Sequence, residues 1–152
     1  MMTRRYYSTK TYAHSVGLSV AFRQAKADSH CSLLHGYALE VRLEFAADAL
    51  NEKSWVVDFG SFKPIKAWLE KNFDHKTLIV ADDPERAWFE EAHKRKIIDL
   101  LIVEKTSSEG FAEMIFDHVT KWLEAEKLSP RVRLHRVEVK EHAGNSAIVE
   151  AV

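Results

Sequence analysis

Residues Tyr37 to Phe45 read Tyr-Ala-Leu-Glu-Val-Arg-Leu-Glu-Phe, with a large apolar side chain at every second position. Because successive side chains of an extended strand point to opposite faces, this pattern puts the large apolar residues on one face and the charged ones on the other. The pattern is typical of a half-buried strand in an antiparallel sheet. We therefore expect this segment to be a strand with one face against the hydrophobic core.

Other segments before and after it are predicted strands. Tyr6 to about His14 forms the first, and Leu18 to Phe22 is a candidate continuation of it. Leu100 to Val103 suits a short strand or a buried extended segment. Roughly Arg131 to Glu141 forms the last strand and is expected to end the ordered core.

Three segments carry helix signals. The first, Phe62 to Phe73, has apolar residues at helical spacing and lysines on the other side. The second starts at Asp82-Asp83-Pro84, with proline in the first turn, and runs towards Lys96. The third starts with a capping box in which Thr106 is followed three positions later by Glu109, and its apolar residues continue to Trp122.

The order of these elements is strand, strand, helices, strand, which favours an α+β fold over an alternating parallel one. We expect an antiparallel four-stranded sheet with two or three helices on one face, in a single domain over residues 1–152. No linker or repeat interrupts the chain. Such a sheet leaves its edges and its other face exposed, so we also expect a homo-oligomer.

The composition is that of an ordinary globular protein, with 46% apolar and 30% charged residues. A formal net charge of -1 gives no overall attraction to nucleic acid or to an anionic membrane, so neither is an expected partner. No segment approaches the ~20 apolar residues of a membrane span, and the N-terminus lacks the apolar core of a signal peptide. The single cysteine fits a reducing compartment, and we expect a cytoplasmic protein.

Three short segments concentrate residues that could do chemistry. The first places Cys31 and His35 just before the central strand, where His35 and Tyr37 project to the same face. The second sets a carboxylate beside an imidazole, in the pair Asp74-His75 at the end of a helix. In the third, Glu141 ends a row of inward-facing valines, a position that is unusual for a carboxylate unless it binds something.

Each of these signals has a structural alternative. Cys31 could be a small buried hydrophobe, as free cysteines usually are. Asp74-His75 could be a helix C-terminus with a favourably placed basic residue. His30 could be a surface residue, and Glu141 taken alone could be solvated. No single segment identifies a site.

Taken in order, the motifs resemble those of the 6-pyruvoyl-tetrahydropterin synthase and 6-carboxytetrahydropterin synthase family. The resemblance extends from about Tyr7 to Ala147, which is nearly the whole chain. The motifs are Cys-x-x-x-His-Gly-x at Cys31–Tyr37, Val-x-Asp-Phe at Val56–Phe59, Phe-Asp-His at Phe73–His75, Ser-Glu at Ser108–Glu109 and Val-x-Glu at Val139–Glu141.

The resemblance implies a tunnelling fold, in which subunits form trimers whose sheets close a barrel, often stacked into hexamers, with the sites between subunits. It also implies a pterin substrate, 7,8-dihydroneopterin triphosphate. By position, it assigns Cys31 as the catalytic thiol, the pair Asp74-His75 as the supporting acid and base, and Glu141 as the pterin anchor. Ser108 and Glu109 are expected beside the substrate.

The resemblance further implies a zinc ion, a Lewis acid held by three histidines. In this sequence the triplet His35-Gly36-Tyr37 ends in tyrosine instead of the last histidine ligand. We favour His14 as the ligand from the first strand, over a rival alignment that puts Phe22 at that position. The third ligand is then Tyr37 or His30, because a catalytic zinc usually takes three protein ligands and keeps one open position.

We therefore expect a lyase acting on a dihydropterin triphosphate, of the 6-carboxytetrahydropterin synthase type, in the queuosine and deazapurine pathway. Phosphate elimination of the 6-pyruvoyl type is the nearest chemical alternative. From a different class, a homologue without zinc could bind a pterin or purine through Glu141 without catalysis. The tyrosine at position 37 motivates this last alternative.

Overall fold

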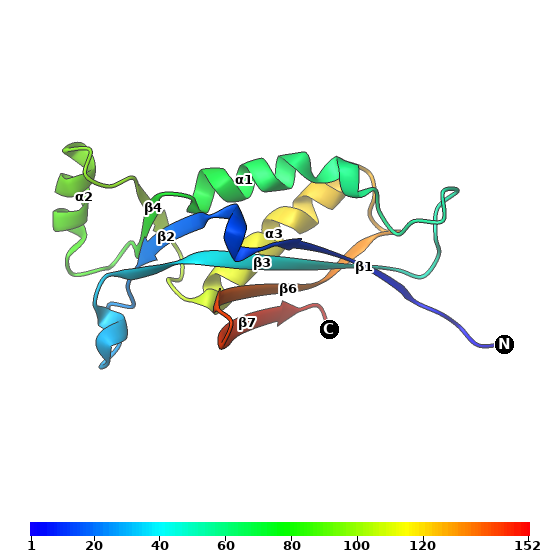
Figure 1. The fold of residues 1–152 in the computed structure, drawn as a ribbon, viewed down its shortest axis with the longest axis horizontal. Helices are drawn as coiled ribbons and strands as arrows, with labels where there is room; N and C mark the ends of the chain where they lie inside the picture. Colours follow the sequence, from blue (N-terminus) through cyan, green and yellow to red (C-terminus); the bar gives the residue numbers. More distant parts are fainter.

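The computed structural model describes residues 1–152 and is built on one long strand, β3 (His35–Ala47) (Figure 1). β1 (Tyr6–Tyr12) and β2 (Leu18–Phe22) pair antiparallel with one edge of β3, and β6 (Arg133–His142) pairs antiparallel with the other. A short 3₁₀ turn, His14–Val16, separates β1 from β2. The predicted central strand and the continuation of the first strand are confirmed.

The sheet has seven strands of mixed direction rather than the four antiparallel strands that we expected. β4 (Lys76–Val80) runs parallel to β2, β5 (Leu100–Val103) runs parallel to β4, and β7 (Asn145–Glu150) forms a hairpin with β6. The strand order is β5-β4-β2-β3-β6-β7, with β1 also paired to β3. The sequence did not predict β4 and β7. β4 is short and its apolar and polar residues do not alternate, and β7 buries only Ala147.

Three helices complete the fold: α1 (Lys63–Phe73), α2 (Arg86–Lys94) and α3 (Ser108–Ala125). α1 and α3 lie over one face of the sheet, whereas α2 lies at one end of the molecule, beyond β4 (Figure 1). Helices occur in all three predicted segments, and the α+β class is confirmed. No helix of the chain combines the length and the apolar character needed to cross a bilayer.

Two helix starts differ from those predicted. Ser107 caps α3, because its side chain accepts a hydrogen bond of 3.0 Å from the Gly110 N–H. Thr106, the expected cap, is 1% exposed and therefore packs inside the protein. α2 begins only at Arg86 with Glu85 at its N-cap, and Asp83 lies before the helix in a buried ion pair with Arg23.

The side chains of β3 that point towards α1 and α3, its inward row, form part of the hydrophobic core. These side chains and the apolar faces of α1 and α3 belong to one cluster of 26 buried residues. Burial of each side chain contributes about 1.5–3 kcal/mol before the entropy cost of ordering it. The residues of this row, all fully buried, are Leu39, Val41, Leu43 and Phe45.

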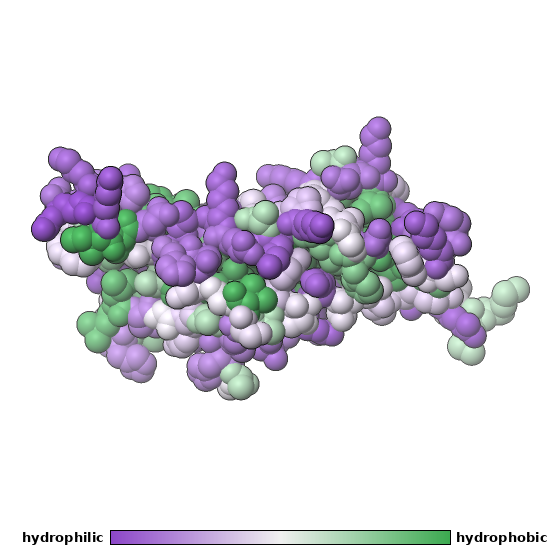
Figure 2. All heavy atoms as spheres, turned by 45° about the horizontal axis from the view of Figure 1, so that its top comes forward, coloured by the Kyte–Doolittle hydropathy of each residue, from purple (hydrophilic) through white to green (hydrophobic).

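The opposite row of β3 and its neighbours on β6 are charged. Lys140 pairs with Glu40 at 3.5 Å, and Arg42 pairs with Glu44 at 3.6 Å. On the helix side, Figure 2 shows a surface dominated by hydrophilic residues, with hydrophobic ones in scattered groups. The large apolar residues are therefore concentrated between the sheet and the two helices, as the alternation in β3 requires.

Candidate functional site

The inward row of β6 ends in a carboxylate. Val137 and Val139 are fully buried, and Glu141, two residues further along, is half-buried. Its Oε1 accepts a hydrogen bond of 3.0 Å from the hydroxyl of Ser108, the buried first residue of α3. The positive end of the α3 dipole also favours a negative charge here. The chain itself therefore fixes this carboxylate at the edge of the core.

Tyr37 is close enough to this carboxylate and to the thiol to interact electrostatically with both. Its ring is 5.8 Å from that of His35 and 6.1 Å from that of His142. Burial raises the pKa of Tyr37, and the charge of Glu141, a hydrogen bond to Glu141 and the charge of the Cys31 thiolate raise it further. The phenol therefore stays protonated at neutral pH and is available as a hydrogen-bond donor.

Cys31 lies on a short 3₁₀ turn, and two hydrogen bonds hold its backbone. The Cys31 N–H donates to the hydroxyl oxygen of Ser29 at 3.3 Å. The Cys31 carbonyl accepts a hydrogen bond of 2.9 Å from the Gln24 N–H. The residue is half-buried, so its thiol remains accessible to a small molecule. Cys31, Tyr37 and Glu141 thus form one group, which we call the thiol cluster.

The pair Asp74-His75 lies at the junction of α1 and β4. His75 Nδ1 donates to Asp74 Oδ1 at 2.7 Å, and the same oxygen accepts a hydrogen bond of 3.3 Å from the Ser19 N–H. This arrangement leaves Nε2 of the imidazole free, on a side chain that is 86% exposed. The φ of His75 is 58°, a left-handed conformation that is uncommon outside glycine and that clusters at functional sites.

Within one chain, no hydrogen bond or ion pair joins this pair to the thiol cluster. His75 borders an open groove that Gly36, Tyr37 and Ala38 also line. Gly36 is a residue of the strand β3. A Cβ there would lie 2.1 Å from the Val20 carbonyl oxygen, so only glycine lets β2 approach β3 this closely.

The residues around His35 do not form a zinc site. Phe22 is paired with His35 across β2 and β3, and the two rings are 4.9 Å apart. His14, which we predicted as a ligand beside His35, instead donates from Nδ1 to the Ala38 carbonyl at 2.5 Å. Ala38 lies roughly 10 Å along the strand from His35, so the two histidines do not converge. Nowhere in the chain are three His, Cys, Asp or Glu side chains grouped to hold a metal ion.

The remaining predicted site residues divide in the same way. Ser108 joins the thiol cluster through Glu141, whereas Glu109 and His30 are exposed and no side-chain hydrogen bond or ion pair joins either to it. Sequence reasoning missed Phe111 of α3, whose buried ring meets that of Phe22 edge-on at 5.0 Å behind His35. Its apolar character marked it only as a core residue, because nothing in a helical period tells which strand it will face.

The fold and the site define a class of protein: an α+β protein with a thiol, a phenol and a carboxylate at the open end of a mixed sheet, and an outward-facing Asp-His pair. The sequence profile of the family described as 6-pyruvoyl tetrahydropterin synthase matches residues 12–152. This chain belongs to that family.

Relatives of known name point to one branch. A 6-carboxy-5,6,7,8-tetrahydropterin synthase from Aquifex aeolicus is 27% identical over 133 residues, which cover 86% of this chain and 82% of the relative. One of the same name from Rickettsia felis is 36% identical over 56 residues, 36% of this chain and 41% of the relative. The match thus spans less than half the length of the Rickettsia protein.

Solved structures agree on the fold. An uncharacterized protein from Wolinella succinogenes has a TM-score of 0.77 at 15% identity, covering 99% of both chains. The 6-pyruvoyl tetrahydropterin synthase of Plasmodium falciparum has a TM-score of 0.69 at 16% identity, covering 97% of this chain and 98% of that one. At such low identity these likenesses support the architecture alone.

The hydrogen bond between Ser108 and Glu141 makes their contributions to stability interdependent. In a double-mutant cycle with Ser108→Ala and Glu141→Ala, measured by urea unfolding, we expect a coupling of about 1 kcal/mol. The matched control replaces Ser108→Ala by Glu109→Ala, which should combine additively with Glu141→Ala. Additive effects of the Ser108 and Glu141 variants would contradict the fixed geometry of the carboxylate.

Proposed function

We propose that this chain is a lyase of the 6-carboxytetrahydropterin synthase type that acts on 7,8-dihydroneopterin triphosphate. On this proposal its product enters deazapurine and queuosine biosynthesis. The observation that carries the proposal is the grouping of Cys31, Tyr37 and Glu141 at one end of the sheet. Family membership supports a pterin as the substrate, and the name shared by the Aquifex and Rickettsia relatives supports the 6-carboxy product.

Glu141 is the proposed recognition residue for the pterin ring. A carboxylate can accept two parallel hydrogen bonds from a ring nitrogen and the adjacent amino group, which fixes the ring in one orientation. Glu141 is suited to this role because Ser108 and the start of α3 already hold it in place. Little side-chain entropy is then lost on binding, which favours affinity.

Cys31 and the pair Asp74-His75 are the proposed acid–base groups. A base must remove a proton from the substrate side chain, and an acid must protonate the fragment that leaves. A half-buried thiol that is fixed by its backbone can serve as the base once deprotonated. Asp74 holds Nδ1 of His75, so the free Nε2 can carry a proton to and from the substrate.

A complete site on this proposal requires a second copy of the chain, in a trimer or hexamer. The His75 side chain is 86% exposed, and no hydrogen bond or ion pair joins the Asp74-His75 pair to the thiol cluster of its own chain, which supports a role at the site of a neighbour. Leu33 and Leu34 follow the 3₁₀ turn His30–Ser32 that carries Cys31, which we call the catalytic turn. They are 66% and 45% exposed, as expected for residues that a partner covers. The outer edges of β5 and β7 are unpaired, which also favours association.

Turnover of 7,8-dihydroneopterin triphosphate tests the reaction. The wild-type protein should release acetaldehyde; loss of triphosphate without acetaldehyde would indicate elimination of the 6-pyruvoyl type instead.

Cys31→Ala should lower kcat by about 10²–10⁴-fold while leaving pterin binding intact. Unchanged turnover of Cys31→Ala would remove the thiol from the mechanism.

Glu141→Gln should instead weaken pterin binding about tenfold, measured by calorimetry, because a neutral amide cannot accept both hydrogen bonds.

Mixing inactive variants tests whether the site is shared between copies. Cys31→Ala and His75→Ala protomers should each be inactive as pure assemblies. Unfolded together and refolded, they should regain a fraction of wild-type turnover, because some interfaces then combine an intact thiol with an intact imidazole. The control is a double variant carrying both changes in one chain, mixed with either single variant. Failure of the two single variants to complement, in mixed assemblies verified by mass, would contradict the shared site.

A second candidate function is a pterin- or purine-binding protein without zinc or catalysis, and the Phe22 ring beside His35 favours it. Wild-type protein from zinc-supplemented cells should contain far less than one zinc per chain. The variant Phe22→His/Tyr37→His, which restores three imidazoles, should hold about one zinc per chain. Zinc-free protein with turnover supports the lyase, and zinc-free protein that binds pterin without turnover supports the binding protein. One tightly held zinc per wild-type chain would contradict our account of the ligands.

A further inference from the structure

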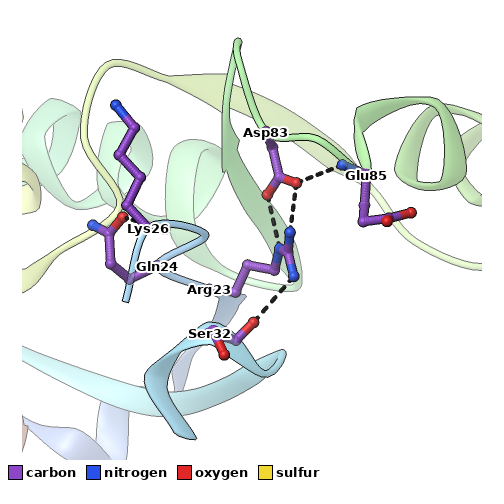
Figure 3. A network of polar contacts seen from close by, with 6 residues as sticks. All are labelled: Arg23, Gln24, Lys26, Ser32, Asp83 and Glu85. Atoms are coloured by element: carbon purple, nitrogen blue, oxygen red, sulfur yellow. Dashed lines mark hydrogen bonds and ion pairs between the residues drawn. The ribbon is translucent and has the colours of Figure 1, made fainter. Parts of the chain in front are cut away.

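Arg23 joins two parts of the molecule that are far apart in the sequence (Figure 3). Its Nε donates to Asp83 Oδ2 and its Nη2 to Asp83 Oδ1, both at 2.8 Å, which makes a bidentate pair. Its Nη1 donates to the Ser32 carbonyl at 3.1 Å. Asp83 Oδ1 also accepts a hydrogen bond of 2.8 Å from the Glu85 N–H. One guanidinium therefore binds a carboxylate and a backbone oxygen together.

The burial of this pair sets it apart from the other ion pairs of the chain. The Asp83 side chain is 0% exposed and that of Arg23 is 18% exposed. The hydrogen bond from Arg23 lowers the pKa of Asp83 against the opposing effect of burial, so the carboxylate is charged at neutral pH. Arg23 also lies over the ring of the buried Phe89 in α2, 6.0 Å from its centroid.

The position of Arg23 links this pair to the thiol. Arg23 directly follows Phe22, the last residue of β2, and Ser32 directly follows Cys31. The next residue, Gln24, holds the Cys31 carbonyl through its N–H. Two backbone carbonyls of the turn that carries the thiol, those of Cys31 and Ser32, are thus held by residues that directly follow β2. Asp83 fixes Arg23 in the orientation that reaches Ser32.

We propose that Arg23 and Asp83 are positioning residues for Cys31, and that the segment from β4 to α2 supports the catalytic turn through them. The catalytic role of Cys31 rests on the proposed function; its positioning by Arg23 rests on the geometry. Guanidinium is required because a single ammonium cannot engage both carboxylate oxygens and the carbonyl in these directions. Apart from this network, no hydrogen bond or ion pair joins the segment around α2 to the thiol cluster, and on this proposal the network links the segment to the chemistry.

Arg23→Lys is the main test. It keeps the positive charge beside Asp83 but removes the guanidinium group that makes two parallel hydrogen bonds to that carboxylate. We expect kcat to fall on the order of 10–100-fold, since a small misplacement of a catalytic group has that cost. Binding of 7,8-dihydroneopterin, which depends on Glu141 at a separate position, should stay within about twofold of wild type. A pair that served only stability would change the unfolding midpoint and leave kcat of the folded protein unaltered.

Alkylation by iodoacetamide gives a readout that requires no turnover. Cys31 is the only cysteine, so the reaction reports on this thiol alone. In Arg23→Lys the freed turn should expose the thiol and speed alkylation on the order of tenfold. Asp83→Asn, checked for folding by circular dichroism, should act in the same direction because it removes the charge that orients Arg23.

The matched control is Asp82→Asn, which changes the neighbouring carboxylate. Asp82 is 70% exposed and pairs only with Lys26, at 3.6 Å. The alkylation rate and kcat of the Asp82→Asn variant should equal those of the wild type. If the wild type lacks turnover but Arg23→Lys still speeds alkylation, the lyase proposal fails and the positioning role stands. Alkylation and kcat equal to wild type in folded Arg23→Lys and Asp83→Asn would overturn the positioning role.

Discussion

One face of β3 has to be buried, and most of the structure follows from that constraint. Its inward row, from Leu39 to Phe45, is covered by α1 and α3, and the facing row of β6 joins the same cluster. Each row continues beyond the part that is fully buried. His35 and Tyr37 extend the row of β3, and Glu141 extends the row of β6, with partial exposure. Chemical groups therefore gather where the core ends, on strands that the core holds rigid.

The proposed site residues of one chain fall into two separate groups. Tyr37 and Glu141 continue the inward rows of β3 and β6, and the charge of Cys31 acts on Tyr37. The Asp74-His75 pair lies beside β2, where the Ser19 N–H donates to Asp74. Within one chain, no hydrogen bond or ion pair joins it to the thiol cluster. This separation, together with unpaired strand edges, is the physical basis for the assembly proposed above.

The aromatic residues at the thiol cluster change what that end of the sheet can bind. Phe22 packs beside His35 and edge-on against Phe111, which makes this side of the cluster apolar. An apolar ring offers no lone pair to a metal ion, whereas it suits the face of a flat heterocycle. Tyr37 adds a neutral donor near the thiol and the carboxylate. These features support the proposed binding of a planar polar ligand.

The sequence by itself determined the features that depend on local periodicity. These are the alternation of β3, the amphipathic helices α1 and α3, the inward position of Glu141 and the order of the short motifs. Only the tertiary structure decided the parallel pairing of β4 and β5, the choice of Phe22 over His14 beside His35, and the ion pair of Arg23 with Asp83. The reason is distance along the chain: the last two partners are 60 residues apart. A period within one segment carries no information about which other segment it will meet, because packing of the whole sheet settles that choice.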